Sequence, residues 1–146
     1  MMYRITLLLA FIALPLRAAD PLGLAVPGVD GNVFATTKAS TIEIVATNGE
    51  SHAPLRFTWI SVERRGGDGK FAVFRVDIQC ECDAMCKKSP VSLEYGASLR
   101  ATWDLRSSDC QNAGQGVYRI AVIDRYSDAT SGYVYHGVSK EFTILE

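Results

Sequence analysis

Residues 117–126, VYRIAVIDRY, decide the fold of this chain. β-Branched and aromatic residues dominate the stretch, and these residue types favour pleated strands. Polar segments rich in Ser, Gly and Asn bound it on both sides, at 106–115 and 127–132. The stretch therefore predicts a β-strand between two loops, and the neighbouring sequence follows the same pattern.

Other segments alternate between apolar and polar residues with period two, which is typical of a strand with one buried face. In SLRATWDL, residues 98–105, Leu99, Ala101 and Trp103 share one face. The glycine-rich segment RGGDG, residues 65–69, predicts the turn of a hairpin. We expect the remaining strands at 23–26, 33–37, 41–48, 55–64, 71–78 and 133–145, the last one bent at Gly137.

These segments amount to seven or eight short strands separated by turn signals, and no segment has the period of an amphipathic helix. Short turns join consecutive strands in antiparallel order. The sequence therefore predicts an all-β protein built as an antiparallel β-sandwich. One long segment, residues 79–96, breaks the alternation and is expected to be an ordered loop.

The N-terminus has the three parts of a secretory signal peptide. Arg4 is followed by an apolar run at 5–16 and by small residues at the expected cleavage point. We expect cleavage after Ala18, because cleavage after Ala19 would place Arg17 three residues before the cut. The chain would then consist of a signal peptide, residues 1–18, and one domain, residues 19–146, secreted or periplasmic. The apolar run is too short to span a bilayer.

Charge and motif content exclude several functions. The whole chain has 15 basic and 16 acidic residues, so nothing favours a nucleic-acid partner. The sequence contains no nucleophile elbow, zinc-protease motif or phosphate-binding loop. His52 and His136 are expected to be surface residues. We therefore expect neither an enzyme nor a cofactor. Tyr126, Tyr133 and Tyr135 are interpreted as half-buried strand residues, with a binding surface as the alternative.

Four cysteines form a compact group: Cys80, Cys82 and Cys86 follow a C-x-C-x3-C spacing, and Cys110 stands in a later loop. In an exported protein this predicts two disulfides. A Cys80–Cys82 bond would close a strained ring, so Cys110 pairs with Cys82 or Cys80. We expect Cys80–Cys86 and Cys82–Cys110, a pairing that would join the 79–96 and 106–115 segments.

The same cysteines also permit two other interpretations. With Met85 they offer soft ligands for Cu(I) or Zn(II). The spacing is not that of standard zinc pairs, and an oxidising compartment disfavours free thiolates. A redox-active pair is the third interpretation, although the C-x-x-C motif is missing.

Four short motifs stand along the chain in a characteristic order: LEYGAS at 93–98, WDL at 103–105, GVYRI at 116–120 and KEFTI at 140–144. Together they resemble bacterial immunoglobulin-like domains, in particular the BsuPI-type proteinase inhibitors and related Big-type modules. The resemblance implies an immunoglobulin-like sandwich. Trp59, Trp103 and Phe142 would be structural, and Tyr118 would form a tyrosine corner, its hydroxyl bonded to the preceding loop.

The sequence therefore predicts an exported, disulfide-stapled immunoglobulin-like module that binds a protein partner of unknown identity. The loops that carry the cysteines form its expected contact surface. Protease inhibition is one version of this function, implied by the resemblance alone. A periplasmic protein that binds copper or zinc through the cysteine group is the alternative function.

Overall fold

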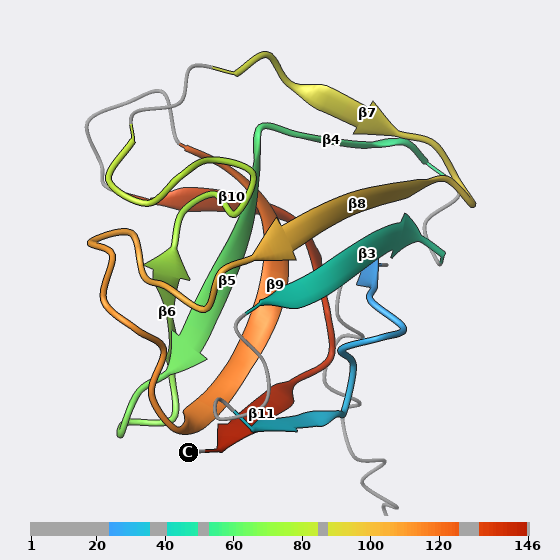
Figure 1. Cartoon of the computed structure of the whole chain (residues 1–146). Coiled ribbons are helices and arrows are strands. Elements are labelled where there is room, and N and C mark those ends of the chain that lie inside the picture. Colours follow the sequence, from blue (N-terminus) through green and yellow to red (C-terminus); the bar gives the residue numbers. More distant parts are fainter. Residues whose placement is uncertain (1–23, 36–40, 50–52, 85–87, 126–131, 146) are drawn as a thin grey trace, which may run out of the picture.

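A computed structural model describes residues 24–35, 41–49, 53–84, 88–125 and 132–145 (Figure 1). The described residues form β-strands, turns and loops and contain no helix, which confirms the predicted all-β class. The strands are β1 (Leu24–Ala25), β2 (Val33–Ala35), β3 (Ile42–Asn48), β4 (Leu55–Phe57), β5 (Trp59–Arg65), β6 (Phe71–Arg75), β7 (Val91–Leu93), β8 (Ser98–Trp103), β9 (Gly116–Arg125), β10 (Tyr133–Val138) and β11 (Phe142–Leu145).

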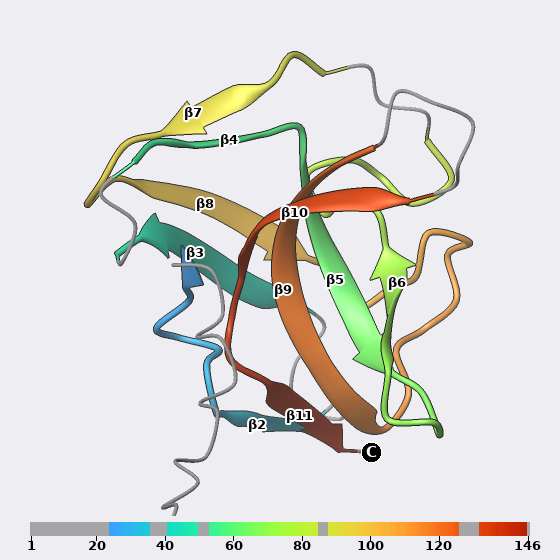
Figure 2. The ribbon, with the colours of Figure 1, turned by 180° about the vertical axis from the view of Figure 1, so that it is seen from behind.

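Two sheets face each other. The larger one has the order β2-β11-β9-β5-β6, with β10 also paired to β9, and the smaller one has the order β1-β3-β8. Figures 1 and 2 show β3 and β8 on one side of the molecule and β5 and β9 on the other. A short pair, β4 and β7, lies at one end. This layered arrangement of largely antiparallel sheets is consistent with the predicted β-sandwich.

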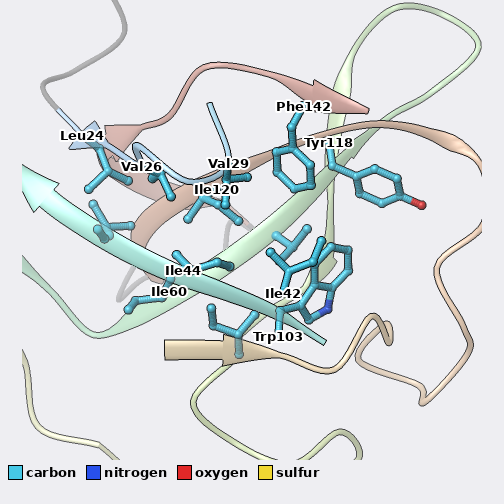
Figure 3. Close-up of a cluster of buried hydrophobic side chains, with 14 of the residues drawn as sticks. Leu24, Val26, Val29, Ile42, Ile44, Ile60, Trp103, Tyr118, Ile120 and Phe142 are labelled. Atoms are coloured by element: carbon cyan, nitrogen blue, oxygen red, sulfur yellow. The ribbon is translucent and has the colours of Figure 1, made fainter. Parts of the chain in front are cut away.

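The core lies between the two sheets and follows the period-two pattern. From the smaller sheet, Ile42, Ile44 and Trp103 are almost completely buried, and from the larger one Ile60 and Ile120 are. Figure 3 shows these side chains converging from opposite layers. Burial of side chains of this size is worth about 1.5–3 kcal/mol each, so the alternation in the sequence determines which sheet faces turn inward.

The stretch 55–64, predicted as one strand, is two strands that belong to different sheets. β4 pairs with β7, and the chain then bends at Thr58 and continues as β5 beside β9 (Figure 1). Phe57 and Ile60 are both fully buried, although three residues apart they would point to opposite faces of a continuous strand. The bend resolves this conflict, and the Thr58 amide donates to Ile123 O at 3.3 Å.

The C-terminal strand is confirmed in outline. β10 and β11 both pair antiparallel with β9, and the register shifts between Tyr135 and Gly137, where the sequence predicts a bend. β11 also pairs parallel with β2, so the sheet is not purely antiparallel. The segment predicted as the 79–96 loop contains β7. These differences give eleven strands within the described residues, where seven or eight were expected.

The predicted signal peptide, residues 1–18, lies outside the described residues and stays a prediction. In the described ranges, no helix has the length and apolar character needed to cross a bilayer.

Candidate functional site

Two loops meet along the free edge of β6, and we call them the linked loops: residues 76–84 and residues 104–112. Ser108 joins them to the edge strand. Its amide donates to Phe74 O at 2.9 Å, and its hydroxyl accepts from Val76 N at 3.0 Å. The Asp83 amide donates to Ser108 O at 3.0 Å. The 104–112 loop therefore satisfies backbone groups that an edge strand would otherwise leave exposed.

A disulfide between Cys82 and Cys110 joins the linked loops covalently. This confirms one predicted bridge and the predicted connection between the two segments. Cys80 is also disulfide-bonded. Its predicted partner, Cys86, lies outside the described residues, so the Cys80–Cys86 bridge stays a prediction.

Arg75 holds the same loops together from inside. The β5–β6 register pairs Glu63 with Val73 but Val62 with Arg75, so β6 carries an extra residue, Phe74, at a β-bulge. Phe74 packs edge-to-face against the core residue Trp103, with ring centroids 6.1 Å apart. Beside it, Arg75 is only 3% exposed. Bulges re-aim side chains in this way, and here two consecutive residues leave the surface.

The Arg75 guanidinium donates to three backbone carbonyls. Nε bonds to Asp77 O at 3.1 Å, Nη1 to Ser107 O at 2.9 Å and Nη2 to Cys80 O at 2.5 Å. The first and third carbonyls belong to the 76–84 loop and the second to the 104–112 loop. A buried charge is tolerated only when such partners replace water. Asp104 adds a carboxylate oxygen 3.8 Å from Nη1.

Asp77 organises the start of the 76–84 loop. Its side chain is 6% exposed, and Oδ1 accepts from the Gln79 amide at 3.1 Å, which closes an Asx turn. Oδ2 forms an ion pair with Lys88 Nζ at 2.5 Å. The Ile78 amide donates to Ile60 O at 2.9 Å, so the turn is anchored to β5 as well.

The backbone of the linked loops is unusual. Among the described residues, the non-glycine positions with positive φ are Asp83 at 66°, Leu105 at 57° and Cys110 at 60°, all in these two loops. Such conformations cost energy for residues that carry a Cβ and persist only where surrounding structure imposes them. The disulfide supplies that constraint at Cys110 and beside Asp83, and the Ala113 amide donates to Leu105 O at 2.6 Å.

A pocket of about 400 Å³ opens between the linked loops and β5. Its volume falls within the range of small-ligand sites, about 300–1,000 Å³. The lining residues come from β5, the end of β6 and both loops: Trp59, Arg75, Val76, Asp77, Cys80, Glu81, Cys82, Asp83, Ala84 and Ser108. Figures 1 and 2 show the two loops beside β6 from both sides.

The cysteine group does not present four thiolates. Cys82 and Cys110 are bonded to each other, and Cys80 is also oxidised, so in this form none of the three is a thiolate ligand. Met85 and Cys86 lie outside the described residues. Among the residues that the structure describes, no group of three or more His, Cys, Asp or Glu side chains is arranged to hold a metal ion.

The predicted tyrosine corner is present. Tyr118, fully buried near the start of β9, donates its hydroxyl proton to Gly114 O at 2.7 Å. Figure 3 shows this hydroxyl pointing away from the core cluster, while the ring packs beside Phe142 and Trp103. Burial raises the pKa of the phenol, and the nearby Arg64 charge partly opposes that rise. Trp103 and Phe142 are core residues, as expected, whereas Trp59 is half-buried and lines the pocket.

The C-terminal aromatic residues have separate roles. Tyr133 is half-buried, as interpreted, and Tyr126 lies outside the described residues. Tyr135 is 36% exposed, and its hydroxyl donates to Oε1 of the fully buried Glu63. Arg119 Nε bonds to the other carboxylate oxygen of Glu63 at 2.6 Å. Burial, followed by the contact with Glu63, raises the pKa of Tyr135 to about 12.

The histidines were both expected to be surface residues. His136 is the extra residue at the irregularity in β10, and it is half-buried, with Nε2 2.8 Å from Asp124 Oδ2. His136 is therefore partly exposed, with 28% of its side chain accessible, and its ring contacts Asp124 of β9. His52 lies outside the described residues.

Sequence reasoning missed Arg75 and Ser108 as parts of the site. An arginine at the end of the apolar strand FAVFR, followed two residues later by Asp77, was the available signal. The bulge that buries Arg75 depends on the pairing register of β6 with β5, which no local pattern reveals. Ser108 is one of several serines in a polar loop, and its bonds to β6 depend on tertiary structure.

Neither the sequence nor the structure of this chain matches a known family model, a curated protein or a solved structure.

Proposed function

We propose that this chain is an exported, non-enzymatic binding module with an immunoglobulin-like sandwich, and that it binds a protein partner through the linked loops. The observation that carries the proposal is the pocket between two loops that one disulfide and one buried arginine hold in place. Loops positioned by a rigid scaffold are the usual place for binding functions in β-sandwich proteins.

Two features support the immunoglobulin-like assignment. The strand order β11-β9-β5-β6 corresponds to the G-F-C-C′ sheet of a variable-type domain, and β1-β3-β8 corresponds to A-B-E. The bond from Tyr118 to Gly114 O lies at the start of the strand equivalent to F, which is the place of the tyrosine corner. The bend into β5 and the β4–β7 pair depart from the standard domain.

The rigidity of the linked loops favours binding. A loop that must become ordered on association loses affinity, at about 0.5–1.5 kcal/mol for each immobilised side chain. Here the backbone is fixed before a partner arrives, by the Cys82–Cys110 bond and by three hydrogen bonds from Arg75. Exposed side chains such as Glu81, Asp83 and Asp109 then stand on a preformed surface.

Site-specific photo-crosslinking tests this function. A photoreactive amino acid replaces Asp83 or Asp109 on the linked loops, or Asp68 in the β5–β6 turn as an exposed control. After expression in the native host and irradiation, we expect one defined partner to crosslink from Asp83 and Asp109 and not from Asp68. A protease as that partner would support the inhibitor version. No crosslink, or the same crosslinks from all three positions, would contradict the proposal.

The proposed export has its own test. N-terminal sequencing of the protein from the native host should begin at Ala19, and a mature protein that retains Met1 would contradict export by this signal peptide.

A further inference from the structure

We propose that the pocket between the linked loops binds a cationic side chain, a lysine or an arginine presented by the protein partner. This inference rests on the proposed function and names the chemistry that the pocket recognises. It follows from three properties of the lining: an aromatic wall, rim carboxylates that form no ion pair with another described residue, and an arginine that already donates to three backbone carbonyls.

The aromatic wall is Trp59, the first residue of β5. The chain has two tryptophans, and they differ in environment. Trp103 is fully buried, and its indole N–H donates to Arg106 O at 2.9 Å. Trp59 is half-buried, and its indole N–H has no hydrogen-bond partner among the described residues. An indole face is the best side-chain partner for an ammonium or guanidinium group.

The carboxylates set the sign of the charge. Asp77 lines the pocket but is already paired with Lys88. Glu81 and Asp83 are both exposed at the rim, and neither forms an ion pair with another described residue. Two negative charges beside an indole face favour a cation, and partial exclusion of water at the pocket wall strengthens the attraction.

Among the described lining residues Arg75 is the positive one, and most of its donors are engaged within the protein. Three of its five N–H groups donate to backbone carbonyls, and Asp104 Oδ1 lies 3.8 Å from Nη1. An incoming anion would also face Glu81 and Asp83 at the rim, which repel it. The lining therefore discriminates against carboxylates and phosphates.

Nuclear magnetic resonance titration of the disulfide-intact mature protein tests this inference. The readout is the indole N–H signal of Trp59, with the Trp103 signal as an internal control. The probes are the acetylated amides of lysine, arginine, norleucine and glutamate, with norleucine as the uncharged counterpart of lysine. We expect saturable shifts of the Trp59 signal with lysine or arginine amide in the millimolar range, and at least fivefold weaker binding of norleucine amide.

Two double variants test how much the carboxylate charges at the rim contribute to binding of the lysine amide. Glu81→Gln combined with Asp83→Asn should weaken the binding of the lysine amide roughly fivefold, by removing two rim charges worth about 0.5 kcal/mol each. Glu43→Gln combined with Asp68→Asn removes two exposed carboxylates elsewhere and should leave binding unchanged. Trp59→Leu, followed at the Ala84 amide, should also weaken binding.

The outcomes separate this inference from the proposed function. Equal binding of norleucine and lysine amides would overturn the cation site, as would tighter binding of the glutamate amide, or shifts caused by Ca²⁺ or Mg²⁺ alone. No shift of the Trp59 signal with any amide would overturn it too. In each case the crosslinking result still decides whether the linked loops bind a partner.

Discussion

The buried arginine provides a quantitative test of how the linked loops are held. Replacing Arg75 with methionine keeps the apolar stem of the side chain and removes its donors. Two of the lost bonds, to Asp77 O and Ser107 O, are buried. Hydrogen bonds to charged groups are worth about 1.5–3 kcal/mol each, and the charge no longer has to be desolvated. We expect the free energy of unfolding to fall by about 3 kcal/mol.

For a domain of roughly 125 residues this loss corresponds to a decrease in Tm of about 12 °C. Thermal unfolding followed by circular dichroism measures the decrease, and urea titration gives the free energy directly. Arg75→Lys should remain destabilised, because an ammonium group cannot reproduce the planar set of donors that reaches three carbonyls.

Arg100→Met is the matched control. Arg100 is 74% exposed and pairs with Glu43 on the outer side of the smaller sheet. Exposed pairs of this kind contribute about 0–1 kcal/mol. A loss below about 1 kcal/mol for Arg75→Met, or equal losses for the two methionine variants, would refute the assignment of Arg75 as the internal connection between the loops.

Three further predictions concern the disulfide and two tyrosines. The double variant Cys82→Ser/Cys110→Ser removes the disulfide between residues 28 apart in sequence. It should lower the free energy of unfolding by about 3–4 kcal/mol in urea titration. An unchanged urea midpoint would contradict a stabilising role for this disulfide. Tyr118→Phe removes the corner hydrogen bond and should cost about 1 kcal/mol by the same assay, and no loss would mean that the bond adds nothing. The pKa of Tyr135 is raised to about 12 from 10.0 by burial and by Glu63, so its contribution to stability is complete below pH 10 and is lost as the pH rises through 12. Wild type should therefore lose more stability than Tyr135→Phe between pH 9 and pH 11, measured by urea midpoints, and parallel losses would exclude this linkage.

The sequence predicts most of the strands because burial on one face imposes period two. The buried set of β3 and the RGGDG hairpin turn both follow from local pattern, whereas β9 is buried on both faces from Ile120 to Ile123. The bend at Thr58 could not be predicted in this way. LRFTWISVER satisfies the strand pattern along its whole length, and only the competing sheets show that Phe57 and Ile60 must both face inward.

The candidate site was predictable in its covalent part. The expected export of the protein and the C-x-C-x3-C spacing of its cysteines led to the Cys82–Cys110 bridge and to the contact between its two loops. The non-covalent part required tertiary structure, because Arg75 reaches the loops only through the bulge in β6. Trp59 was expected to be structural, and its place in the pocket depends on where β5 begins after the bend.

Disulfide mapping of the protein from its native host tests the central claim, that one covalent bond joins the linked loops, most directly. Trypsin leaves Cys80, Cys82 and Cys86 on one peptide, so cleavage after Glu81 and before Asp83 is needed to separate them. Mass spectrometry without reduction should then find the Cys82 fragment attached to the peptide that contains Cys110. Attachment of Cys110 to Cys80, or four free thiols with bound copper or zinc, would contradict the account.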